Sequence, residues 1–303
     1  MNKNHNLENI KNPDQHDKRL TLQKQNAMKS IQKIFITVAG ISLLTACNDK
    51  QTQQDKTESI DSTTTTKAAF VPVEFEASDS LLVSGNLYEA DPAFPLMILC
   101  HQRGFCKYEY AGVAERFNEL GFNCLAIDQR CGGPIAENRN ETWLRAVEQN
   151  KPTDFLDAEK DIVAAIEWAY ATYQKPVILL GSSYSSTLCV YQAVENEKVS
   201  AVIAFSPGNY FMDVRGDLTK LLVDFEKPFF FTAANEEMLF VRELVLGRPR
   251  SETQVVFAPE GQGMHGARVL WPTQEGGEEY WVALEDFLEK IKHAPAQPEG
   301  VTQ

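Results

Sequence analysis

The sequence predicts an α/β fold built on one mostly parallel sheet. Short apolar runs alternate with amphipathic helical segments between residues 68 and 293. The run at 95–100 is almost continuously apolar, which is typical of a strand buried on both faces of a parallel sheet. Strands that alternate with helices imply right-handed crossovers, so these segments are expected to form one large domain.

The individual elements follow from hydrophobic periodicity. Two alternating segments open the domain as an antiparallel pair, and six further runs have the length and composition of strands. Helices are expected where apolar residues share one stripe, as Val113, Ala114 and Phe117 do before the stop at Gly121. The predicted strands are 71–76, 81–88, 95–100, 123–127, 176–180, 200–205, 228–232 and 253–258. The predicted helices are 108–120, 157–173, 184–196, 238–246 and 278–292.

Residues 28–46 have the pattern of a secretory signal. A basic start at Lys29 and Lys33 leads into an apolar run that is too short to cross a bilayer as a helix. A buried core helix is the alternative interpretation of this run. The ending Leu44-Thr45-Ala46-Cys47 resembles the lipobox of bacterial lipoproteins. This resemblance implies cleavage before Cys47, lipidation of that residue, and a location in the bacterial cell envelope, facing the periplasm or the cell surface.

The segments around this signal are not expected to fold. Residues 48–67 are polar and lack the apolar content for a core, so residues 47–67 are interpreted as the lipidated cysteine and a flexible tether to the membrane. Residues 1–27 are interpreted as a disordered leader or an over-extended gene start. Residues 294–303 are expected to be a loose tail.

The composition argues against several classes of function. The formal net charge is −13 at pH 7, and the sequence offers no basic face for nucleic acid. No metal site or cofactor is predicted, because neither Cys-x-x-Cys nor His-x-x-x-His spacing occurs. Cys106 and Cys131 each follow a predicted strand at the same end, so outside the cytoplasm they could oxidise to a disulfide. The sequence cannot fix that pairing.

A candidate nucleophile lies in the sequence Gly181-Ser182-Ser183-Tyr184-Ser185. A predicted strand precedes it and a predicted helix follows, which is the context of a nucleophile elbow with Ser183 at its tip. Ser185 departs from the common pattern, which has glycine at that position.

This elbow, the order of elements and three short segments resemble the α/β-hydrolase superfamily, in particular its dienelactone-hydrolase-like branch. The resemblance covers nearly all of residues 70–292 and implies a mostly parallel sheet with helices on both faces and no large cap domain. Dienelactone hydrolases proper use a cysteine nucleophile, whereas Ser183 stands here, so their substrate is not implied. The three segments are Leu99-Cys100-His101-Gln102-Arg103-Gly104, Asp128-Gln129-Arg130 and Met264-His265-Gly266.

The partners of Ser183 follow by elimination and from this resemblance. His265 is the predicted base, because it follows the last predicted strand in a glycine-rich loop and matches the Ser…acid…His order of the fold. Against the family pattern, Glu237 falls on the acid position, with Glu236 and then Asp213 as alternatives. Helix N-terminal charge stabilisation is the competing role for the two glutamates.

Two backbone N–H groups are expected to form the oxyanion hole. One belongs to Tyr184, which follows the nucleophile, and the other to Arg103, with Gln102 as the alternative. His101 is expected to support that loop through a hydrogen bond. Asp128 and Arg130 are expected to fix the turn after the fourth strand.

Together these residues predict a serine hydrolase that cleaves carboxylic esters of small or medium-sized substrates through an acyl-enzyme. A serine peptidase or acyltransferase on the same fold is the first alternative. A non-catalytic binding lipoprotein is the second, although the intact Ser…Glu…His order argues against it. The predicted partners are a small-molecule ester and, through Cys47, a membrane. The oligomeric state is not predicted.

Overall fold

The structure is a computed structural model, and it describes residues 70–247 and 251–292. The predicted leader, signal segment, Cys47, tether and tail lie outside these residues. None of the helices in the described ranges is long and apolar enough to span a bilayer.

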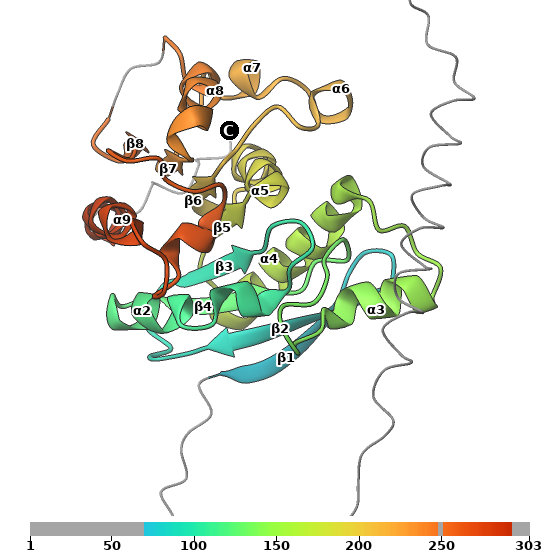
Figure 1. The fold of residues 1–303 in the computed structure, drawn as a ribbon. Helices are drawn as coiled ribbons and strands as arrows, with labels where there is room; N and C mark the ends of the chain where they lie inside the picture. Colours follow the sequence, from blue (N-terminus) through green and yellow to red (C-terminus); the bar gives the residue numbers. More distant parts are fainter. Residues whose placement is uncertain (1–69, 248–250, 293–303) are drawn as a thin grey trace, which may run out of the picture. The chain divides into compact units, whose positions relative to one another are not determined.

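One mixed sheet of eight strands forms the centre of the domain (Figure 1). Its order is β1-β2-β4-β3-β5-β6-β7-β8; β2 runs antiparallel to β1 and β4, and all other neighbours are parallel. This is the α/β-hydrolase fold, as predicted, and each predicted strand agrees with its observed bounds to within about two residues. The strands are β1 (Val71–Glu76), β2 (Leu82–Tyr88), β3 (Leu96–Cys100), β4 (Asn123–Ile127), β5 (Val177–Ser182), β6 (Val199–Phe205), β7 (Phe229–Thr232) and β8 (Gln254–Val256).

Helices cover both faces of this sheet, and α2 and α9 lie on the face opposite α4 and α5 (Figure 1). The predicted helix 108–120 is divided into η1 and α2, because Ala111 takes an extended conformation. The helical elements are η1 (Lys107–Tyr110), α2 (Val113–Glu119), α3 (Glu141–Glu148), η2 (Phe155–Ala158), α4 (Glu159–Tyr173), α5 (Tyr184–Glu195), α6 (Met212–Arg215), α7 (Leu218–Leu221), η3 (Asn235–Glu237), α8 (Met238–Leu244), η4 (Ala267–Leu270) and α9 (Gly277–Lys292).

A hydrophobic core lies on each face of the sheet. The side chains of β3 alternate between the two faces, so this strand contributes to both cores. Ile98 and Cys100 pack into the core that contains α4 and α5, whereas Met97 and Leu99 pack into the core that contains α2 and α9. All of these side chains are fully buried. The continuous apolar run in the sequence therefore reflects two buried faces.

The sheet determines where functional residues can meet. Because β3, β5, β6, β7 and β8 are parallel, their carboxyl ends lie at one edge, where ligands of open α/β sheets bind. Only residues 206–228, with the one-turn helices α6 and α7, connect β6 to β7. No cap domain is evident in the described residues.

Candidate active site

Ser183 occupies the sharp turn between β5 and α5. Its backbone has φ 60° and ψ −127°, a region that non-glycine residues rarely adopt, and its N–H donates to Phe205 O at 2.8 Å. The side chain remains partly exposed, while the residues on either side are buried. The turn thus holds one hydroxyl above the carboxyl edge of the sheet, as a nucleophile elbow requires.

The small residues of the elbow have different roles. A Cβ at Gly181 would lie 2.4 Å from Ser186 Cα, so any side chain there would push the strand and helix apart. Ser185 has room for its hydroxyl, which lies 2.8 Å from Cys100 O and accepts a hydrogen bond from Ser182 N at 2.9 Å. The departure from the glycine pattern at Ser185 therefore adds hydrogen bonds within the elbow.

Ser183, His265 and Glu237 form one hydrogen-bonded chain, which we call the triad. His265 Nε2 lies 2.8 Å from Ser183 Oγ, and His265 Nδ1 lies 2.5 Å from Glu237 Oε1. A carboxylate only accepts, so Nδ1 carries the ring proton and Nε2 is free to accept the serine proton. The His265 side chain is 45% exposed, so the ring stays open to solvent.

Glu237 is the carboxylate that meets the histidine. It ends the short helix η3 after β7, and its second oxygen, Oε2, accepts a hydrogen bond from Ser206 Oγ at 2.7 Å. The two alternatives, Glu236 and Asp213, are exposed. Glu236 and Glu237 are adjacent in η3 but point in different directions. Glu237, the last residue of η3, faces the imidazole, whereas Glu236 is exposed to solvent.

Ser206 was missed by the sequence analysis. It follows β6 with φ 56°, and its hydroxyl accepts a hydrogen bond from Gly266 N at 3.0 Å while donating to Glu237. It therefore connects the triad acid to the turn that carries His265. The available signal was its position directly after a predicted strand at the same sheet edge.

The triad shifts the pKa values of its own members. The hydrogen bond that His265 donates to the Glu237 carboxylate raises the pKa of His265 above its ordinary value of 6.5, and this outweighs the opposing effect of partial burial. Partial burial acts to raise the pKa of Glu237, but the hydrogen bonds from His265 and Ser206 outweigh it and hold that pKa below its usual range. Glu237 therefore stays ionised over the pH range in which His265 titrates.

We expect the acid limb of the activity profile to reflect this shift. Because the carboxylate stabilises the imidazolium, His265 stays protonated to a higher pH than an isolated histidine. The kcat/KM of any reaction in which His265 takes the proton of Ser183 should therefore fall as the pH drops through a midpoint above 6.5. A pH series of kcat/KM measures it, and a midpoint below that value would contradict the assigned ion pair.

The two predicted oxyanion donors differ from the alternative donor in their hydrogen bonding. Tyr184 is the first residue of α5, so its N–H belongs to the group that has no intrahelical partner. Gln102 N donates to Glu109 Oε2 at 2.8 Å, which removes the alternative donor. Arg103 N makes no hydrogen bond with any residue that the structure describes.

His101 makes the contact expected of it. Its Nδ1 donates to Gln102 O at 2.8 Å and its Nε2 accepts from Gln129 N at 2.9 Å. Burial lowers the pKa of His101, in keeping with this neutral, hydrogen-bonded ring. The imidazole thus fixes the peptide immediately before Arg103.

The structure does not contain the Cys106–Cys131 disulfide that the sequence analysis considered. Both residues are free, buried thiols. Cys131 Sγ lies 2.9 Å from the Tyr184 hydroxyl, and Cys106 Sγ faces Asn138 O at 4.0 Å. The two cysteines do follow neighbouring strands at one sheet edge, but their side chains pack against different partners.

Asp128 and Arg130 form buried ion pairs, in keeping with a role in fixing the turn after β4. Asp128 Oδ2 lies 2.9 Å from Lys107 Nζ. The fully buried Arg130 guanidinium contacts Asp161 at 2.7 Å and Asp79 at 2.6 Å. These charges are compensated within the protein, so we assign them to structure.

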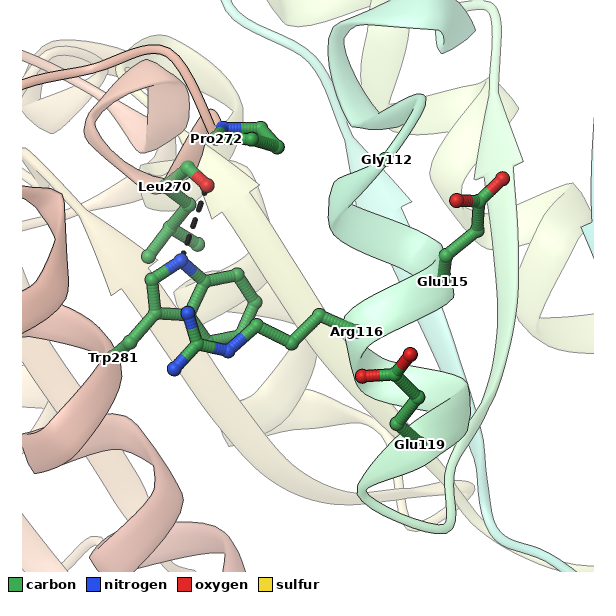
Figure 2. Close-up of a pocket in the computed structure, with 7 residues that line it drawn as sticks. All are labelled: Gly112, Glu115, Arg116, Glu119, Leu270, Pro272 and Trp281. Atoms are coloured by element: carbon green, nitrogen blue, oxygen red, sulfur yellow. Dashed lines mark hydrogen bonds between the residues drawn. The ribbon is translucent and has the colours of Figure 1, made fainter.

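A surface cavity of about 220 Å³ lies beside α2 and α9, and none of the triad residues lines it (Figure 2). The Arg116 guanidinium lies 4.3 Å from the centre of the Trp281 ring and is paired with Glu278 and Glu285. The Trp281 indole donates to Leu270 O at 3.1 Å. The Arg116 guanidinium and the Trp281 indole are thus used within the protein, and we assign no ligand to the cavity.

Comparison with known proteins supports the fold. No protein-family model and no curated protein sequence matches the chain. Among solved structures, an esterase from Pyrococcus furiosus is similar with a TM-score of 0.54 at 18% identity, covering 73% of this chain and 92% of that one. A dienelactone hydrolase from Anabaena variabilis gives 0.54 at 17% identity, with 73% and 97% covered. The esterase domain of a Rhodothermus marinus protein gives 0.51 at 14% identity, with 73% and 98% covered. At these identities the likeness establishes the α/β-hydrolase fold, and the chemistry must be argued from the site.

Proposed function

We propose that this chain is a serine hydrolase that cleaves carboxylic esters of small or medium-sized substrates. The observation that carries the proposal is the continuous hydrogen-bonded chain from Ser183 through His265 to Glu237 at the carboxyl edge of the sheet. Such a chain makes an otherwise weak hydroxyl nucleophilic, because the base accepts its proton as the new bond forms. The similarity to esterases and dienelactone hydrolases is consistent with this reaction class.

The geometry supports the following sequence of steps. Ser183 Oγ attacks the ester carbonyl carbon as His265 Nε2 takes its proton, and Glu237 stabilises the imidazolium. The N–H groups of Tyr184 and Arg103 then stabilise the oxyanion of the tetrahedral intermediate. His265 returns the proton to the departing alcohol, which leaves an acyl group on Ser183. A water molecule repeats these steps on the acyl-enzyme, so the acid is released and the serine hydroxyl is restored.

The side chains around Ser183 support an open and partly aromatic site. Phe155 is 36% exposed and stacks on the Tyr184 ring at 4.8 Å, and the Arg103 guanidinium lies 5.5 Å from the centre of the Phe155 ring. In the described residues no cap restricts access to the triad. This arrangement favours substrates that reach the site from solvent.

Covalent labelling and a substrate panel test the proposal together. A fluorophosphonate should label the folded protein, and peptide mapping should place the label on Ser183. Ester hydrolysis should exceed hydrolysis of matched peptide amides, which would favour the esterase over the peptidase alternative. Added alcohol acceptors would reveal an acyltransferase. Folded protein that neither becomes labelled nor hydrolyses any ester would favour the binding lipoprotein instead.

We also propose that the chain is a lipoprotein anchored through Cys47, on the evidence of the Leu44-Thr45-Ala46-Cys47 sequence. Two or more acyl chains on one residue give stable membrane attachment. Replacing Cys47 with serine should therefore move nearly all of the protein from the membrane fraction to the soluble fraction of the expressing bacterium. Ser62→Ala, a change within the predicted tether, should leave the distribution unchanged. Wild-type protein found mainly in the soluble fraction would contradict the anchor.

A further inference from the structure

Glu109 is a fully buried carboxyl group that the proposed mechanism does not use. It lies in η1, which follows the loop that carries Arg103. Glu109 Oε2 accepts a hydrogen bond from Gln102 N at 2.8 Å, and Oε1 accepts one from Ser182 Oγ at 3.1 Å. Ser182 lies 73 residues after Glu109 in the chain, so this carboxyl group joins remote segments.

A third segment is joined to the same group through Ser182. Ser182 Oγ accepts a hydrogen bond from Ala267 N at 2.8 Å, in the turn directly after His265. The packing at this point is tight, because a Cβ at Gly266 would lie 2.7 Å from both Gln102 Oε1 and Ser182 Oγ. The loop after β3, the end of β5 and the turn after β8 therefore meet around one carboxyl group.

Keeping a carboxyl group in this place is costly. Burial raises the pKa of Glu109 to about 8, although hydrogen bonds from Gln102 and Ser182 and the nearby Arg268 and His265 act in the opposite direction. An apolar side chain would avoid that cost but would leave Gln102 N and Ser182 Oγ without their partner. We therefore attribute the presence of a carboxyl group at position 109 to its hydrogen bonds with Gln102 N and Ser182 Oγ, and not to the volume of its side chain.

The three connected segments carry the components of the proposed reaction. Gln102 immediately precedes Arg103, whose N–H is the second oxyanion donor. Ser182 immediately precedes the nucleophile, and Ala267 follows His265 by two residues. Fixing the Gln102 peptide restricts the direction of the next N–H, and an oxyanion donor works only if it points at the developing charge.

We propose that Glu109 is a positioning residue that holds the oxyanion loop and the histidine turn against the nucleophile elbow. The expected changes in kcat and KM rest on the proposed esterase function. The expected changes in the hydrogen bonding of the three segments do not. Glu109 does not touch the reacting atoms, and it acts through Gln102 and Ser182. Its loss should therefore lower kcat more than it changes KM.

The test compares Glu109→Ala and Glu109→Gln with Asn118→Ala as a matched control. Misplacing a catalytic group by about 1 Å costs roughly 10²-fold, so Glu109→Ala should lower kcat by about 30- to 100-fold and change KM by less than about 3-fold. Glutamine can accept from Gln102 N and donate to Ser182 Oγ, so Glu109→Gln should recover kcat to within about 5-fold of the wild type. Asn118 Nδ2 makes two hydrogen bonds, to Tyr88 O and Phe122 O, outside the site, so its loss should leave kcat unchanged.

Amide hydrogen exchange provides a readout that does not depend on activity. Exchange at Gln102 and Ala267 should become faster in Glu109→Ala but not in Asn118→Ala, because only the first variant removes the shared carboxyl group. If Glu109→Ala fails to fold, Ser182→Ala replaces it, with faster exchange expected at Ala267 and a lower kcat.

Each outcome bears on one proposal. An unchanged kcat in folded Glu109→Ala, no rescue by glutamine, or an equal loss in Asn118→Ala would overturn the positioning role. Unchanged exchange at Gln102 would also overturn it. Wild-type protein that hydrolyses no ester would overturn the proposed function alone, and faster exchange at Gln102 and Ala267 in Glu109→Ala would then still support the positioning role.

Discussion

Replacing Ser183 with alanine is expected to abolish ester hydrolysis. The substitution removes the only atom that can form the acyl-enzyme, while the oxyanion donors and the rest of the site remain. Loss of a triad nucleophile costs about 10⁴-fold or more in kcat, so the variant should retain at most a trace of wild-type turnover. Labelling by a fluorophosphonate should disappear at the same time. Steady-state kinetics on the best ester of the panel and intact-protein mass spectrometry measure the two effects.

A matched control separates chemistry from folding. Ser200 also lies on the sheet, but its hydroxyl donates to Val177 O, and Val177 begins β5 whereas the triad lies beyond the carboxyl ends of the strands. Ser200→Ala should keep full activity and full labelling. Ser183→Ala should fold normally, because alanine fits the space of serine and inherits the same backbone strain. Wild-type turnover by folded Ser183→Ala would exclude the hydrolase mechanism.

Most of the fold could be predicted because its signals are local. The strands are short apolar runs buried on both faces, and the long helices have apolar stripes that match their core faces. Helix α3 was missed because its buried face consists only of the small side chains of Thr142 and Ala146. Its remaining signal was the helix cap at Asn140, whose side chain accepts from Trp143 N at 2.7 Å.

The site residues were predictable to the extent that each one follows a strand of a parallel sheet. That rule brought Ser183, His265 and Glu237 to the same edge, and the structure connects them by hydrogen bonds. It also places Ser206 at this edge but does not assign it a role, and it does not identify Glu109, because both roles depend on contacts between segments that are remote in the chain. The sequence left the Cys106–Cys131 pairing open for a related reason, since a shared edge does not determine where two side chains point; both thiols are free in the structure.

Replacing Glu237 with glutamine is expected to cause the second largest loss, and the surroundings of the carboxylate explain why. Oε2 accepts hydrogen bonds from Ser206 Oγ at 2.7 Å and Ala234 N at 3.3 Å, so the carbonyl oxygen of a glutamine should take that side. The amide NH₂ would then face His265 Nδ1 and donate to it. This arrangement stabilises the tautomer with the proton on Nε2, which cannot accept the proton of Ser183. The expected fall in kcat is about 10³- to 10⁴-fold, with little change in KM.

The adjacent Glu236 provides the control for this prediction, because Glu236→Gln removes one negative charge next to the same position without altering the hydrogen bond to His265. Its activity should stay within about 2-fold of the wild type, as expected for an exposed surface charge. Kinetics of the two variants side by side, with thermal unfolding to show that both are folded, decide between the neighbouring carboxylates. If Glu236→Gln shows the large loss and Glu237→Gln does not, the histidine is oriented by the other residue. If neither variant loses activity, a carboxylate is not required, and His265 must be held in its tautomer by the backbone of its own turn.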